Sequence, residues 1–114
     1  MPKDYKSITK DISEYIGELR KVAPDAMKGF SEMSKGALKP GVLDTKTKEL
    51  IALAIGVSQR CDGCIGFHSK ALVEQNATRE EVAETLAMAV YMGGGPVLMY
   101  AADAMRAFDQ FSEK

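Results

Sequence analysis

The sequence lacks several features that would point to a charged partner or to a membrane. Its 15 basic and 16 acidic residues give a formal net charge of −1, so composition offers no electrostatic reason to expect binding to nucleic acid or to an anionic membrane. The longest apolar stretch, residues 86–102, is interrupted by residues 93–96 (GGGP) and is too short to cross a bilayer. Residues 1–10 are polar and lack the apolar segment of a secretory signal, so we expect a cytoplasmic protein.

Alternation of apolar and polar residues, which marks half-buried strands, is also missing. Almost every segment instead repeats its apolar residues at the spacing of an α-helix. No repeat, low-complexity stretch or linker divides the chain, and 114 residues suit one domain with one modest core. We therefore predict an all-α fold, with a single six-helix domain over residues 1–114.

Caps and breakers place these helices along the chain. Side chains suited to N-caps, a T-x-x-E capping box and prolines suited to a first turn mark the starts, and glycines mark the ends. The expected helices are residues 7–22, 24 to a loop at 36–41, 44 or 45 to 59, the segment after the first cysteine to 75, 79–92, and 96 onward. The first helix should carry an apolar stripe made of Ile8, Ile12, Tyr15 and Leu19, which Ile16 widens. Residues 50–57, apolar nearly all round, should lie in the middle of a core or between subunits.

The chain has only two cysteines and one histidine, and these lie close together. At about 100° per residue, Cys61, Cys64 and His68 fall at roughly 0°, 300° and 340° around a helix, which is a single narrow face. A C-x-x-C pair in a chain without a secretory signal indicates redox chemistry or a metal site before a structural disulfide. At a helix start the two sulfurs can approach bonding distance, and a thiol beside a proton acceptor there has a lowered pKa. We expect a reversible disulfide between the two cysteines.

A glutamate in the preceding helix can join these residues. If the third and fourth helices form an antiparallel hairpin, Glu49 lies roughly 15 Å back from the hairpin end and His68 about 9 Å from it. By the same rise per residue, the offset of around 6 Å is short enough for long side chains and a bridging water. The sequence thus permits a proton relay from the Glu49 carboxylate through His68 to Cys64.

The same four residues carry a resemblance to a known family. Glu49, eleven residues, CDGC, three residues and His68 form the pattern E-x11-C-x2-C-x3-H. This resembles the AhpD-like alkylhydroperoxidases of the carboxymuconolactone decarboxylase superfamily, from Asp44 to about Ala107. The resemblance implies an all-α fold that assembles into trimers or hexamers. It also implies a disulfide-cycling peroxidase or peroxidase adaptor.

The resemblance further implies roles for the individual residues. Cys64 would carry the reactive thiolate, Cys61 would resolve it, and His68 and Glu49 would move protons. The expected partners are a small hydroperoxide or a partner-protein disulfide and other copies of the chain, with no cofactor and no metal. One position departs from alkylhydroperoxidase D, which carries a histidine just before its second cysteine where this chain has Gly63. The departure bears on peroxidase efficiency and on the choice of partner.

Other interpretations of these residues remain open. The cysteines could be buried, inert thiols or zinc ligands, although a closed zinc site usually needs four such ligands and the chain offers two cysteines and one histidine. His68 could be a hydrogen-bonded core histidine, and the helix macrodipole favours an acidic residue such as Glu49 near a helix start. The seven methionines suit core and interface packing. The glycine run lacks the spacing of a phosphate-binding loop.

Two other functions compete with a thiol oxidoreductase. One is a lyase like 4-carboxymuconolactone decarboxylase, which would act on a small lactone acid. That branch of the superfamily generally lacks the cysteine pair, so the CDGC segment argues against it. The other is a non-catalytic oligomeric scaffold in which the cysteines have no redox role.

Overall fold

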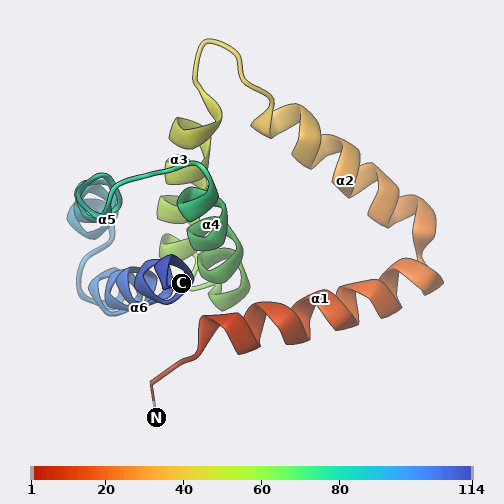
Figure 1. Ribbon diagram of the computed structural model, residues 1–114, viewed down its shortest axis with the longest axis horizontal. Coiled ribbons are helices and arrows are strands. Elements are labelled where there is room, and N and C mark those ends of the chain that lie inside the picture. Colours follow the sequence, from red (N-terminus) through yellow and green to blue (C-terminus); the bar gives the residue numbers. More distant parts are fainter. Residues whose placement is uncertain (1, 114) are drawn as a thin grey trace.

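Six α-helices form the architecture of residues 2–113, the part of the chain that the computed structural model describes (Figure 1). They are α1 (Tyr5–Val22), α2 (Pro24–Leu38), α3 (Thr45–Ser58), α4 (Asp62–Glu74), α5 (Arg79–Gly93) and α6 (Gly95–Ser112). No strand occurs in this range, so the predicted all-α class is confirmed. Within the same residues, no helix combines the length and the apolar character that a bilayer crossing requires.

The expected caps set most of the helix starts. The Asp44 side chain accepts the Thr47 backbone N–H at 2.8 Å and caps α3. Both halves of the capping box of α5 are present, since Thr78 and Glu81 each accept the other's backbone N–H. These short-range contacts explain why the starts of the third and fifth helices are predictable from the sequence.

Two predicted boundaries differ from the structure by more than one residue. Helix α1 begins at Tyr5 rather than Ser7, because the Asp4 carboxylate accepts the backbone N–H groups of Lys6 and Ser7 and caps the helix earlier. Helix α2 continues to Leu38, so the loop predicted at residues 36–41 begins only after that residue. Gly36 is therefore a helical residue, whose lower helix propensity does not end the helix.

The core lies among α3, α4, α5 and α6. Helices α3 and α4 form a hairpin, α6 packs on α4 and on α5, and α3 also packs on α5 (Figure 1). The buried apolar residues of the cluster are Tyr5, Leu53, Val57, Ile65, Leu72, Val82, Leu86, Ala89, Val97, Ala101, Ala104, Ala107 and Phe108. The hairpin predicted between the third and fourth helices is thus present at the centre of the fold.

The first two helices extend away from this core as an arm. The start of α1 packs against α4, where Tyr5 and Thr9 are buried, but Tyr15 and Leu19 are 69% and 49% exposed. The predicted apolar stripe therefore does not face the core in the second half of α1. Helix α2 has no buried residue. It lies apart from α4, α5 and α6 (Figure 1). The helical period identifies an apolar face correctly, but it does not show what covers that face.

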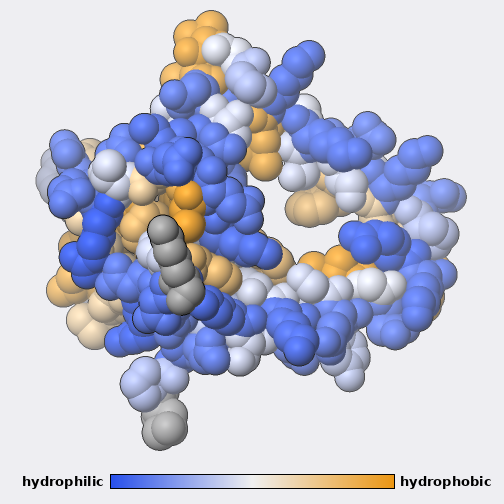
Figure 2. All heavy atoms as spheres, in the orientation of Figure 1, coloured by the Kyte–Doolittle hydropathy of each residue, from blue (hydrophilic) through white to orange (hydrophobic). Residues whose placement is uncertain are grey.

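The arm and the α5–α6 pair leave two apolar grooves open. A groove of about 570 Å³ between α1 and α2 includes Ile16, Leu19, Met27 and Phe30 in its lining. A second, of about 440 Å³, lies between α5 and α6 and is lined by Ala83, Leu86, Ala87, Val90, Leu98, Ala101, Ala102 and Met105. Figure 2 shows the opening that α1, α2 and the core enclose, with apolar side chains along its inner rim and over the α5–α6 side.

Candidate functional site

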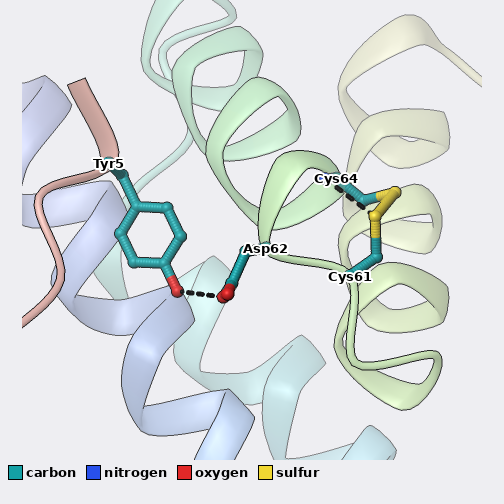
Figure 3. Close-up of a disulfide and its surroundings, with 4 residues drawn as sticks. All are labelled: Tyr5, Cys61, Asp62 and Cys64. Carbon is teal, nitrogen blue, oxygen red and sulfur yellow. Dashed lines mark hydrogen bonds between the residues drawn. A yellow bond between two sulfur atoms is a disulfide. The ribbon is translucent and has the colours of Figure 1, made fainter. Parts of the chain in front are cut away.

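A disulfide joins Cys61 and Cys64 at the start of α4 (Figure 3). The two Cα atoms are 5.2 Å apart, and both residues are half-buried. Cys61 is the N-cap of the helix, and its Sγ accepts the backbone N–H of Cys64 at 3.1 Å. The first N–H groups of a helix carry partial positive charge, so this position stabilises a thiolate once the disulfide is reduced.

A tight turn between α3 and α4 brings the cysteines against α3. Arg60 adopts a left-handed conformation with φ 58°, and the Cys61 N–H donates to the Gly56 carbonyl at 3.0 Å. A Cβ atom on Gly56 would lie only 2.8 Å from the Cβ of Cys64. The absence of a side chain at Gly56 therefore lets α3 approach the cysteine closely. Sequence reasoning missed this residue, although a glycine inside an apolar helix is the signal of such an approach.

Glu49 and His68 form a direct pair beside the disulfide. Glu49 Oε1 lies 3.0 Å from His68 Nδ1, and Glu49 is only 4% exposed. The sequence allowed for a bridging water here, whereas the structure has direct contact. With Nδ1–H donated to the carboxylate, Nε2 is the nitrogen left to take up a proton. His68 lies one helical turn beyond Cys64, and within residues 2–113 no hydrogen bond joins it to either sulfur of the disulfide.

The position that departs from alkylhydroperoxidase D is covered by α1. A Cβ on Gly63 would lie 3.0 Å from Cδ1 of Ile12, so a larger residue there would require the isoleucine to move. The packing of α1 on α4 is thus compatible with glycine at this position.

The four predicted residues lie around the α3–α4 hairpin as two contacting pairs, one of sulfurs and one of carboxylate and imidazole. Asp62, between the cysteines, accepts a hydrogen bond from the buried Tyr5 hydroxyl at 2.9 Å (Figure 3). Sequence reasoning did not single out either of these residues. In the described part of the chain, no three His, Cys, Asp or Glu side chains gather in a way that could hold a metal ion.

The sequence profile of the carboxymuconolactone decarboxylase family matches residues 24–107, which include all four predicted site residues. The chain belongs to this family. A family member from Legionella pneumophila has a crystal structure that superposes with a TM-score of 0.94, at 58% identity over 96% of this chain and 97% of that one. The family assignment and the fold therefore agree.

Three further relatives are similar to the chain in sequence or in structure. An uncharacterised protein of Cupriavidus necator is 41% identical over 96% of both chains. A Thermotoga maritima family member, described with a suggested part in the antioxidative response, has a TM-score of 0.69 at 34% identity, over 75% of this chain and 88% of that one. The alkyl hydroperoxide reductase AhpD of Mycobacteroides abscessus is 32% identical over 59% of this chain and 43% of its own length. The AhpD-like resemblance stated from the sequence is thereby confirmed.

Proposed function

We propose that this protein is a thiol-dependent oxidoreductase, either an alkylhydroperoxidase or a disulfide-reductase adaptor, that cycles Cys61 and Cys64 between dithiol and disulfide. The observation that carries the proposal is the disulfide at the N-terminus of α4, one helical turn from the Glu49–His68 pair. The similarity to an alkyl hydroperoxide reductase supports it. A lyase on the same fold would leave the paired cysteines without a role.

The proposed peroxidase cycle needs only these residues, a hydroperoxide and a dithiol donor. The Cys64 thiolate attacks the terminal peroxide oxygen, the O–O bond breaks, and the alcohol leaves with a proton, which produces a sulfenic acid on Cys64. The Cys61 thiol then displaces hydroxide, which leaves as water, and the disulfide closes. A dithiol donor reduces this disulfide by two successive exchanges and becomes a disulfide itself.

The Glu49–His68 pair is the proposed proton relay of this cycle. His68 takes up the Cys64 proton on Nε2, and the buried Glu49 carboxylate stabilises the imidazolium that results. The same imidazolium can return its proton to the departing alkoxide. In the adaptor reaction the Cys64 thiolate attacks a partner disulfide in place of a peroxide.

The test of this function is an assay with a panel of small hydroperoxides and dithiol donors. Donor oxidation that depends on both the peroxide and the protein identifies a peroxidase. Reduction of a partner protein's disulfide without peroxide identifies an adaptor. If the protein accelerates neither reaction above the rate of its Cys64→Ser variant, the proposed function is wrong.

We expect the Cys61–Cys64 disulfide to form reversibly. Reduced protein treated with mild peroxide should lose both alkylatable thiols and two mass units, and a dithiol should restore them, because the sulfurs lie within one helical turn. Mass spectrometry after alkylation measures both forms. Two thiols that stay fully alkylatable after peroxide treatment would contradict the proposal.

We also propose that the protein is a homo-oligomer, as a hexamer or a trimer. Single subunits rarely leave apolar grooves of this size open, and the helix surfaces around them expose Ile51, Ile55, Phe30, Met33, Met88, Tyr91, Met92 and Met99. Light scattering at micromolar protein and ordinary salt should give a multiple of the chain mass. Phe30→Glu, in the groove between α1 and α2, should shift this mass downward. A wild-type protein with the mass of one chain would contradict the proposal.

A further inference from the structure

The segment that leads into α1 is tied to Asp62, the first of the two residues between the cysteines. The Lys3 ammonium donates to Asp62 Oδ1 at 2.9 Å, and the Tyr5 hydroxyl donates to the same oxygen at 2.9 Å. Lys3 also pairs with Asp103 on α6 at 2.9 Å. We refer to Lys3, Tyr5 and Asp62 as the N-terminal clamp.

Helix α6 fixes the backbone of the clamp. The Gln110 side chain accepts the Tyr5 N–H at 2.8 Å and donates to the Lys3 carbonyl at 2.9 Å. The Lys3 ammonium also lies 4.9 Å from the centre of the Tyr100 ring. Gln110 holds the backbone of Lys3 and Tyr5, and Tyr100 and Asp103 hold the Lys3 ammonium. The Lys3 ammonium and the Tyr5 hydroxyl are therefore held at Asp62 in a defined geometry.

The two donors keep their protons over the whole physiological range. The hydrogen bond to Asp62 is the main cause that raises the pKa of Lys3 above its usual value. Burial, and then the hydrogen bond to Asp62, raise the pKa of Tyr5 well above that of a free phenol. The Asp62 carboxylate thus has two permanent donors on one oxygen.

This carboxylate lies close to both sulfurs along the chain. Asp62 follows Cys61 directly, so bond lengths alone keep its oxygens within about 10 Å of that sulfur. A carboxylate at such a distance disfavours a thiolate and raises the thiol pKa. In the structure the Asp62 side chain points away from the disulfide toward Tyr5, and its charge is shared with Lys3 and the tyrosine hydroxyl (Figure 3).

We propose that the N-terminal clamp sets the thiol pKa and the reduction potential of the Cys61–Cys64 pair by neutralising Asp62. The proposal rests on the proposed redox function. Lys3, Tyr5 and Asp62 are positioning residues, since none of them reacts with peroxide or donor. The charged or titratable groups next to the clamp are Tyr100, Asp103 and Arg106, and those next to the disulfide are Arg60, which precedes Cys61, and the Glu49–His68 pair; all of them remain unchanged in the test below.

If the clamp neutralises Asp62, the substitutions Asp62→Asn and Lys3→Met should shift the thiol pKa in opposite directions. Asp62→Asn keeps the shape and an acceptor oxygen but removes the negative charge, so the lower thiol pKa should fall by about half a unit. The disulfide should then become easier to reduce at a pH above this pKa, because reduction there takes up two electrons and one proton and leaves a thiolate that the loss of the negative charge stabilises. Lys3→Met leaves the carboxylate without its cation and should raise the thiol pKa by a similar amount. Both shifts are modest because Asp62 is partly exposed and water screens its charge.

The measurements are the pH dependence of thiolate absorbance in the reduced protein and the equilibrium of the disulfide with a dithiothreitol redox buffer. The control is Arg79→Met, which removes one positive charge from a surface pair with Asp109 that makes no hydrogen bond to Lys3, Tyr5 or Asp62, and should leave both values unchanged. In an Asp62→Asn background, Lys3→Met should shift the thiol pKa and the disulfide equilibrium by less than it does in the wild-type protein, because the carboxylate that Lys3 neutralises is already absent.

A clamp that only stabilises the fold gives a different result. The melting temperature would then fall in the variants while the thiol pKa and the disulfide equilibrium stayed at the wild-type values. Shifts of the same sign in Asp62→Asn and Lys3→Met, or shifts no larger than in Arg79→Met, would overturn the proposal.

Lys3 is partly exposed, so its variant tests the clamp even if a change at the buried Tyr5 prevents folding. These readouts need no peroxide, so a wild-type protein without turnover would refute the proposed function and not the clamp.

Discussion

A Cys64→Ser variant is expected to lose hydroperoxide turnover by at least about 10³-fold, the scale of loss when an enzyme's nucleophile is removed. The serine hydroxyl has a similar shape, but it is not ionised near neutral pH and does not attack a peroxide oxygen. Steady-state oxidation of the dithiol donor measures the loss. Wild-type turnover in this variant would exclude Cys64 as the attacking residue.

The Cys61→Ser variant is the matched comparison for this experiment. It should still react once per subunit and hold a sulfenic acid on Cys64, which a dimedone-type reagent traps for mass spectrometry. Cys61 is the helix N-cap, and its sulfur already accepts the Cys64 N–H, so a thiolate is also stabilised at that position. If Cys61→Ser is the variant that fails to react, the roles of the two sulfurs are the reverse of those proposed.

The second large effect is expected at the carboxylate–imidazole pair. His68→Ala should slow alkylation of Cys64 near neutral pH by about 10²- to 10⁴-fold, the usual contribution of a positioned general base. Glu49→Gln should slow it less, because the imidazole remains and loses only the charge that stabilises its protonated form. The rate is measured against pH in a Cys61→Ser background, so that only one thiol reacts.

A stability measurement separates this relay from a purely structural pair. His68→Ala strands the buried Glu49 carboxylate without its partner, which costs about 1–3 kcal/mol of folding free energy. The double variant with Glu49→Gln removes the stranded charge and should recover part of that stability without recovering the alkylation rate. If the pH profile of Cys64 is unchanged in His68→Ala, the histidine has a structural role only.

The sequence was sufficient for the two helices that carry the site. Caps such as Asp44 act within three residues, and C-x-x-C with a histidine four residues later places three groups on one helix face. Only the pairing of α3 with α4 had to be assumed to bring Glu49 to His68. The direct contact between them depends on the distance between the helix axes, which the close packing of Gly56 on Cys64 sets.

The parts that could not be predicted depend on contacts between residues far apart in the chain. Tyr5 and Asp62 are 57 positions apart, and no local pattern connects them. The apolar stripe of the first helix was correct as a pattern, yet its second half faces away from the core. An apolar helix face needs another apolar surface to pack against. The spacing of its residues does not show whether that surface belongs to the same subunit or to a neighbouring one.

The absence of buried residues in α2 also affects how the fold opens. A 15-residue helix in water is only marginally stable through its own hydrogen bonds, so α2 depends on whatever packs against its apolar side. Its backbone amides, at residues 25–38, belong to the least protected part of the chain, whereas those of α3 and α4 can exchange only when the core opens. Helix α2 can therefore unfold by itself while the helices that hold the disulfide remain folded.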